Sequence, residues 1–202
     1  MLIVGITGTP GSGKTYFSMQ IIKKFKNAAV IELNNVVNKY NAFYKIDNEK
    51  TKIVNISKLN RIVNKQIKEF RQMQTKSNKN LLIVYVGHLV PELKIKLDLC
   101  FAIRSKLKIL EKRLKKRRYS KEKIKENLIC EAEDYCGIKA KIISKLFYEI
   151  ETKNEKNHAM HIIEFMQKGI DLAELKKIGL RNSIDKMPEL LELIKNKNIY
   201  NL

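Results

Sequence analysis

The chain has 202 residues, 44% of them hydrophobic and 31% charged, which is the balance of a globular protein with one main core. Its 41 Lys and Arg residues outnumber its 21 Asp and Glu residues, and the resulting formal net charge of +20 favours polyanionic partners such as nucleotides and nucleic acids. The sequence contains no run of about 18 apolar residues, the length that a membrane span needs. No leader precedes the first apolar run, so we expect a cytoplasmic protein without a membrane partner.

Apolar runs of strand length alternate along the chain with longer segments of helical period. This alternation is typical of an α/β protein with a mainly parallel sheet flanked by helices. The strands that we predict are residues 2–6, 29–32, 81–86, 97–103 and 146–151.

A glycine-rich loop follows the first predicted strand directly. Residues 8–15 read GTPGSGKT, which matches the pattern G-x-x-x-x-G-K-[ST]. Gly8, Gly11 and Gly13 allow the backbone to turn its N–H groups inward around an anion, a conformation that a Cβ would strain. The apolar period after the loop predicts a helix, whose N-terminus favours negative charge. The loop therefore predicts a phosphate cradle.

Two side chains at the end of this loop carry the expected chemistry of a nucleoside triphosphate. Lys14 is a mobile point charge that can reach the β- and γ-phosphates. Thr15 offers a hydroxyl to Mg²⁺, a cation that prefers oxygen ligands. We therefore predict ATP and Mg²⁺ as the cofactors of this site.

The remaining elements are predicted from helical periodicity. A polar stretch precedes a helix at residues 57–74, and a longer helical region at 106–145 is broken near residues 118–120. A further helix is expected at 156–166. Two short helices in the tail are expected to pack on the flank of the sheet, with a nucleic-acid-binding module as the alternative.

The break in the long helical region is strongly basic. Arg113, Arg117 and Arg118 lie in or beside it. A planar guanidinium grips phosphate oxygens bidentately, so these residues suit a lid that closes over a triphosphate. The alternative is a solvated basic helix end.

The order of three segments resembles a known family. GTPGSGKT is followed by VGHLVP at 86–91 and by KRLKKRRYSKEKIKENLICE at 112–131, as in the adenylate kinase isoenzyme six family. Members of that family are small proteins similar to nucleoside monophosphate kinases, and are also described as ATPases of small ribosomal subunit maturation. The resemblance covers residues 1–166 and leaves 167–202 as a helical extension.

The resemblance implies a P-loop NTPase fold with a five-stranded, mainly parallel sheet, an acceptor region at about 34–57 and a lid at about 112–122. It implies phosphotransfer from ATP to AMP or another nucleoside monophosphate, together with ATP hydrolysis, and a small-subunit ribosomal protein and ribosomal RNA as partners. The residues implied in ATP binding are Gly8, Gly11, Ser12, Gly13, Lys14, Thr15, Tyr16 and Arg117.

Further roles follow from the same resemblance. The catalytic residues that it implies are Lys14, Arg113 and Arg117. Asn34, Asn35 and His88 are expected at the acceptor. A late basic contact to the adenine side of ATP corresponds to Lys153 or Lys156.

The chain departs from the family pattern mainly at the acceptor. Asn34 and Asn35 stand where the family usually has Gly-Asp, and residues 50–59 carry Lys, Asn and Ser where the family has acids. Val86 precedes the Gly-His pair where the family often has an acid that orients the water shell of Mg²⁺. Asp98 cannot replace that acid, because it lies near the start of its strand and ligands gather at the carboxyl ends.

Three hypotheses follow. The first is a kinase of the nucleoside monophosphate type with ATPase activity. The second is a nucleotide-switched ribosome-assembly ATPase that binds RNA, which the charge of +20 and the altered acceptor region favour; a general compositional bias toward Lys is the alternative source of that charge. The third is a kinase for another small acceptor, such as a nucleoside or a shikimate-like alcohol.

Overall fold

The computed structural model describes residues 1–46, 51–77, 81–151 and 153–168, together with 184, 186, 188, 189 and 192. Its centre is a five-stranded sheet in the order β2-β5-β1-β6-β7, in which every neighbouring pair is parallel. The strands are β1 (Leu2–Thr7), β2 (Ala28–Glu32), β5 (Leu82–Val86), β6 (Leu97–Ile103) and β7 (Ser144–Ile150). The predicted P-loop α/β fold with a parallel five-stranded sheet is therefore confirmed.

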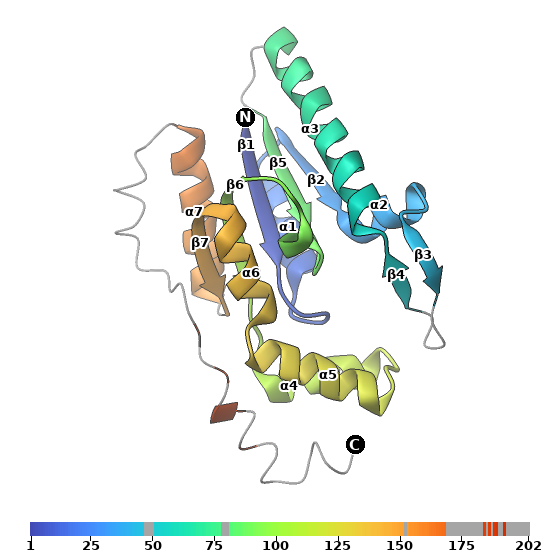
Figure 1. The fold of residues 1–202 in the computed structure, drawn as a ribbon. Helices are drawn as coiled ribbons and strands as arrows, with labels where there is room; N and C mark the ends of the chain where they lie inside the picture. The colour runs from blue at the N-terminus through green and yellow to red at the C-terminus, as the bar shows by residue number, and fades with distance from the viewer. Residues whose placement is uncertain are drawn as a thin grey trace.

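Helices cover both faces of this sheet (Figure 1). One face packs against α1 (Lys14–Lys24) and α7 (Lys153–Gln167), and the other against α2 (Leu33–Lys39), α3 (Ile56–Ser77) and α6 (Tyr135–Ile143). The ring of Phe17 on α1 meets Phe101 on β6 edge-on, with centroids 5.6 Å apart. Because both faces are covered, the central strands are apolar almost throughout.

A pair of helices, α4 (Leu107–Lys116) and α5 (Lys121–Ala132), lies beyond the carboxyl ends of the strands (Figure 1). Its own small core contains Leu107, Leu110, Leu114, Ile124, Leu128 and Ala132. We call this helix pair the lid. The predicted break between its helices is confirmed: Arg118 adopts a left-handed conformation with φ of 58°, and Ser120 caps α5 by accepting from Lys123 N.

The prediction of a single break in the region 106–145 is wrong, because a second one separates α5 from α6. Asp134 has φ of 54°, and its carboxylate accepts a hydrogen bond of 3.1 Å from the Gly137 amide. A short polar side chain that tolerates the left-handed region and caps the next helix allows one helix to end and another to begin with only two residues between them.

The polar stretch after β2, to which we assigned no elements, also has regular structure. It contains α2 and an antiparallel hairpin of β3 (Phe43–Ile46) and β4 (Lys52–Val54). The hairpin projects from the sheet on the same side as the lid, at the carboxyl end of β2 (Figure 1). The 3₁₀ turn η1 (Val90–Glu92) follows β5.

The predicted helical extension at 167–202 falls mostly outside the described residues. Of those that are described, Lys186 is buried and contacts Glu151 at the end of β7. Glu189 accepts a 2.8 Å hydrogen bond from the Leu107 amide at the start of α4. In the described part of the chain, no helix has both the length and the apolarity needed to cross a membrane.

Candidate active site

The glycine-rich loop joins β1 to α1 and needs its glycines for two different reasons. At Gly8, where φ is 133°, a Cβ would lie 2.4 Å from the carbonyl oxygen of Ile103. At Gly13 nothing lies within 4 Å of such a Cβ, but φ is 114°. The first glycine is therefore required by close packing against β6 and the second by backbone conformation. The resulting loop wraps around the N-terminus of α1, which favours an anion.

The Lys14 side chain folds over this loop. Its ammonium donates hydrogen bonds of 2.7 Å to the Gly8 carbonyl and 3.0 Å to the Thr9 carbonyl. Burial lowers the pKa of Lys14 to about 8, against the opposing pull of nearby acidic groups that include Glu131 and Glu32. A partly desolvated cation that donates to two neutral carbonyls is available to pair with an anion.

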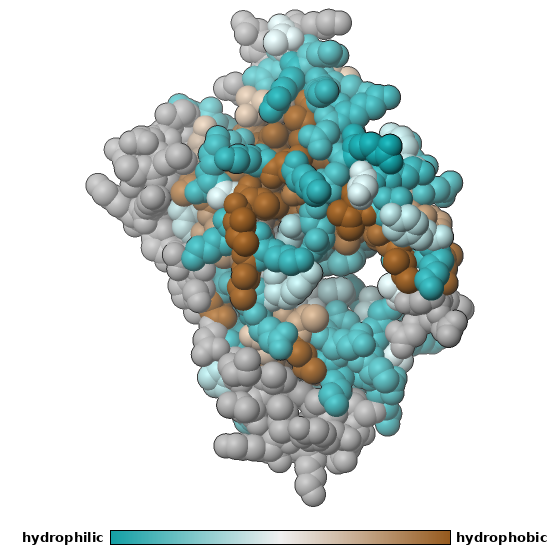
Figure 2. All heavy atoms as spheres, in the orientation of Figure 1, coloured by the Kyte–Doolittle hydropathy of each residue, from teal (hydrophilic) through white to brown (hydrophobic). Residues whose placement is uncertain are grey.

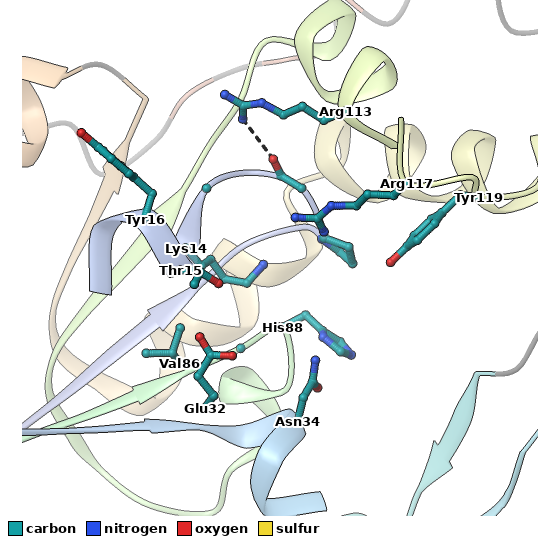
Figure 3. Close-up of a pocket in the computed structure, with 14 residues that line it drawn as sticks. Lys14, Thr15, Tyr16, Glu32, Asn34, Val86, His88, Arg113, Arg117 and Tyr119 are labelled. Atoms are coloured by element: carbon teal, nitrogen blue, oxygen red, sulfur yellow. Dashed lines mark hydrogen bonds between the residues drawn. The ribbon is translucent and has the colours of Figure 1, made fainter. Parts of the chain in front are cut away.

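A cavity of about 520 Å³ opens over the loop (Figure 3). We call it the donor cavity. It is lined by Pro10, Gly11, Gly13, Lys14, Thr15, Tyr16, Glu32, Asn34, Val86, Gly87, His88, Arg113, Arg117 and Tyr119. The cavity is surrounded by the cations of Lys14, Arg113 and Arg117, the Thr15 hydroxyl and the turned loop. The cations and the loop fit a triphosphate, and the hydroxyl fits its magnesium ion.

Two of the three predicted lid arginines, Arg113 and Arg117, reach the donor cavity, and they do so differently. Arg118 is exposed and lines neither this cavity nor the one that adjoins it. One Arg113 nitrogen donates 3.0 Å to the Gly11 carbonyl and 3.3 Å to the Ser12 carbonyl, so this side chain ties the lid to the loop (Figure 3). Arg117 is the C-cap residue of α4 and points into the same space from the lid. Their catalytic roles stay predictions.

A second cavity of about 590 Å³ adjoins the first. We call it the acceptor cavity. It lies between α2, the hairpin, the lid and α6, where the molecule is visibly hollowed (Figure 2). The two cavities share four lining residues, Pro10, Asn34, His88 and Tyr119. Lys52 and Lys123 line the acceptor cavity, and none of its described lining residues is acidic, so it suits an anionic ligand.

The other predicted site residues differ in where they lie relative to the two cavities. Asn34 and His88 line both cavities, whereas Asn35 is exposed and lines neither. The side chain of Ser12 is buried under the loop beside Gly8, so only its backbone faces an anion. His88 is exposed where the two cavities meet. Partial desolvation and the charge of Lys14 lower the pKa of its imidazole, which is therefore neutral at pH 7.

Of the two candidates for the late basic contact that the resemblance implies, Lys156 lies on α7. The Lys156 ammonium lies 5.4 Å from the centre of the Tyr16 ring, which is exposed at the edge of the donor cavity. Burial and the nearby charge of Arg113 lower the pKa of Lys156. The side chain of Lys153, the other candidate, lies outside the described residues.

Comparisons with known proteins agree with this geometry. The family model of the AAA domain matches residues 4–134. A protein named "Putative adenylate kinase" from Methanococcus maripaludis is 30% identical over 144 residues, which cover 69% of this chain and 72% of that protein. One of the same name from Methanocaldococcus jannaschii is 29% identical over 80% of this chain and 84% of its own length.

The chain belongs to this AAA-domain family. A shikimate kinase from Acinetobacter baumannii, solved in complex with shikimate, has the same fold, with a TM-score of 0.51, 9% identity, and coverage of 84% of this chain and 94% of that one. Such a similarity describes the fold alone. The family assignment supports a kinase-like P-loop protein, and the residue-by-residue roles still depend on the site itself.

This AAA-domain protein also contains a buried ionic cluster that we did not predict. Arg104, directly after β6, contacts the carboxylates of Glu131, Glu149 and Asp134, the first two at 3.1 Å. Glu131 accepts further hydrogen bonds from the Ser105 amide at 3.0 Å and from the Thr9 hydroxyl. The cluster therefore joins the phosphate loop to the end of the lid.

A second unpredicted residue is Glu32, the last residue of β2. It lines the donor cavity together with Lys14 and Thr15 (Figure 3). Its signal in the sequence was an acid at the carboxyl end of a predicted strand, where side chains from neighbouring parallel strands converge. Asp98, by contrast, lies at the opposite end, where its carboxylate accepts from the Ile3 amide and pairs with Lys145. The expectation that Asp98 cannot serve the site is therefore confirmed.

Proposed function

We propose that this chain transfers the γ-phosphoryl group of ATP to the phosphate of a nucleoside monophosphate, with AMP as the first candidate, and that water is the acceptor in a slower ATPase reaction. The observation that carries the proposal is the junction of the two cavities. A triphosphate over the glycine-rich loop and a monophosphate in the acceptor cavity would meet beside Asn34, His88 and Tyr119. The names of the archaeal relatives support the same reaction class.

The reaction needs little covalent chemistry from the protein. An oxygen of the acceptor phosphate bonds to the γ-phosphorus while the bond from that phosphorus to the bridging oxygen breaks, so that ADP leaves with the electron pair. Lys14, Arg113 and Arg117 surround the donor cavity with positive charge, which stabilises the charge that spreads over the transferring group. Bound Mg²⁺ would neutralise charge on the β- and γ-phosphates.

The acceptor cavity favours a phosphate-bearing acceptor over a neutral one. Lys52 and Lys123 approach it from the hairpin and from the lid, and its described lining includes no carboxylate that would repel a phosphate. The neutral imidazole of His88 is available to hydrogen-bond an acceptor oxygen or a water at the junction.

The test is incubation with labelled ATP and Mg²⁺ plus AMP, CMP, GMP, UMP, adenosine or no acceptor, with separation of the products. We expect a nucleoside diphosphate from at least one monophosphate, slower phosphate release without an acceptor, and neither product from Lys14→Ala. Absence of any diphosphate product would contradict the kinase proposal. Turnover that survives in Lys14→Ala would identify a contaminating enzyme.

A basic groove supports a second candidate function, RNA binding by a nucleotide-switched ATPase in small ribosomal subunit maturation. The groove has a volume of about 510 Å³ and runs along α3, whose surface is hydrophilic (Figure 2). Arg61, Lys65 and Lys68 line it at helical spacing, and Lys94 lines it from the loop before β6. A row of cations on one helix face suits a phosphate backbone.

The RNA proposal predicts a specific salt dependence. Affinity for a small-subunit ribosomal RNA fragment should fall steeply with ionic strength, and the double variant Lys65→Glu, Lys68→Glu should weaken binding and flatten that slope. A matched variant, Lys23→Glu, Lys26→Glu, changes exposed lysines at the end of α1 and should have a smaller effect. Equal losses in both variants would mean that the net charge, not the groove, holds the RNA.

A further inference from the structure

The donor cavity has an apolar residue at the carboxyl end of β5, a position from which an acid could bind the waters of a magnesium ion. Val86 ends β5 immediately before Gly87 and His88, and it lines the cavity beside the phosphate loop. Mg²⁺ in a phosphate site keeps several of its waters, and a carboxylate that accepts from those waters holds the ion in place. A valine cannot do this.

A carboxylate stands on the neighbouring strand instead. In the parallel pairing of β2 with β5, Glu32 lies directly opposite Val86. Residues that pair in register point to the same face of a sheet, and their strands lie about 4.8 Å apart. The side chains of Glu32 and Val86 therefore point to the same face of the sheet, at its carboxyl edge, from neighbouring strands. The longer side chain of glutamate, compared with aspartate, helps to span that separation.

The surroundings of Glu32 match such a role. Its side chain is half-buried and directed toward Lys14 and Thr15 (Figure 3). Its negative charge acts on the ammonium of Lys14. Among the described residues that line the donor cavity it is the single acid, and the described residues contain no cluster of three metal-ligating side chains that would provide another site.

We propose that Glu32, together with the Thr15 hydroxyl, holds the hydration shell of the Mg²⁺ that accompanies ATP, so that β2 supplies the carboxylate absent from β5. The inference rests on the proposed function in one respect, because it presumes that a nucleoside triphosphate binds over the loop. Glu32 is in this scheme a positioning residue, since it acts through the metal's waters.

The scheme predicts effects of opposite sign with and without metal. Without Mg²⁺, the Glu32 carboxylate repels the phosphates, so Glu32→Gln should bind an ATP analogue as tightly as the wild type or more tightly. With Mg²⁺, the same variant should bind the ion about tenfold more weakly in the ternary complex, as is usual when an outer partner of a metal is removed. A merely structural role would weaken both.

The experiment measures binding rather than turnover. Fluorescence of a labelled, non-hydrolysable ATP analogue is titrated without metal and with increasing Mg²⁺, and electron paramagnetic resonance counts bound Mn²⁺ in the ternary complex. Glu69→Gln, which removes an exposed acid on α3, is the matched control and should behave as wild type. The double variant Glu32→Ala, Val86→Asp returns the acid to β5 and should recover much of the metal affinity that Glu32→Ala loses.

The outcomes separate this inference from the proposed function. Failure of the wild type to bind the ATP analogue under any condition would overturn both. Analogue binding with an unchanged Mg²⁺ dependence in Glu32→Gln would overturn the role of Glu32 and leave the kinase proposal standing. Because Val86 is buried, the double variant is first checked for thermal unfolding; if it does not fold, Glu32→Asp, which should retain part of the metal affinity, replaces it.

Discussion

The ammonium of Lys14 should make nucleotide binding at the phosphate loop depend on pH. It is held by two backbone carbonyls, and burial keeps its pKa at about 8. Phosphates would favour its charged form, so its pKa should be higher in the nucleotide complex than in the free protein. Binding strength that depends on this charge is complete below the lower of the two pKa values and is lost progressively as the pH rises from the lower value to the higher one.

We therefore expect the affinity for an ATP analogue to be level near pH 7 and to fall above about pH 8, approaching about tenfold per pH unit. Measuring the dissociation constant by fluorescence from pH 7 to 9.5 checks this. In Lys14→Gln binding should be weak and independent of pH over this range, whereas Lys26→Gln, at an exposed lysine after α1, should keep the wild-type profile. A flat profile in the wild type would contradict the prediction.

The two lid arginines should separate kinetically. Arg113 already bonds the Gly11 and Ser12 carbonyls, so Arg113→Ala should loosen the loop and raise the KM for ATP as well as lower kcat. Arg117 points into the donor cavity from the end of α4, and Arg117→Ala should lower kcat more than it raises KM, because its charge matters most in the transition state. Steady-state kinetics of both variants give the changes in kcat and in the KM for ATP. The same changes in both variants would contradict separate roles for Arg113 and Arg117.

At the scale of single residues, the sequence predicted those side chains whose role is fixed by local spacing. Lys14 and Thr15 follow from the loop pattern, and both line the donor cavity. Glu32 and Arg104 were missed because their importance comes from strand pairing and from contacts 27 and 45 residues away. Only the order of strands in the sheet brings such groups together.

At the scale of elements, the start of the lid depends on a distant part of the chain. Helix α4 has no side-chain cap of its own. The Glu189 carboxylate instead accepts from the Leu107 amide and pairs with the buried Lys186 at 2.9 Å. The lowered pKa of Glu189 reflects these bonds, which outweigh its burial. An anion at this position satisfies a free amide and the helix dipole.

Glu189→Ala should therefore destabilise the protein by about 1–2 kcal/mol and speed hydrogen exchange at the first turn of α4. Glu192→Ala is the matched control, because its bond to Lys108 is exposed on both sides and solvent screens such a pair. Urea denaturation and amide exchange give both quantities. Equal effects of the two substitutions would show that Glu189 does not cap the lid.

The elements that sequence reasoning found are those with a strong apolar period, and the ones that it missed, α2 and the hairpin strands, are short. All five core strands are buried or half-buried, with the apolar runs expected for two covered faces. The hairpin strands β3 and β4 have four and three residues, all exposed or half-buried. Although they contain apolar side chains, runs this short show no clear period. The break at Asp134 depends on one residue's left-handed conformation, which periodicity does not report.

At the scale of the whole molecule, the ionic cluster at Arg104 connects three parts. The guanidinium of Arg104 contacts the carboxylates of Glu149 on β7, Glu131 at the end of α5 and Asp134 before α6. Glu131 also accepts a hydrogen bond from the hydroxyl of Thr9 in the phosphate loop. Burial and a hydrogen bond with Asp134 raise the pKa of Glu149. The guanidinium thus compensates buried carboxylates that would otherwise repel one another.

Arg104→Met should remove this compensation while keeping apolar volume. We expect a loss of about 3–5 kcal/mol in the free energy of unfolding at pH 8, because the carboxylates remain buried without a counter-charge. The pKa of Glu149, already raised by burial, would rise further in the folded variant once the guanidinium is gone. The folded state would then bind more protons than the unfolded state, so the loss should shrink as the pH falls toward about 5. Urea denaturation at both pH values tests this, with Arg61→Met, an exposed arginine on α3, as the control. A loss that is equal at both pH values would mean that Arg104 contributes packing rather than charge to the junction between the lid and the phosphate loop.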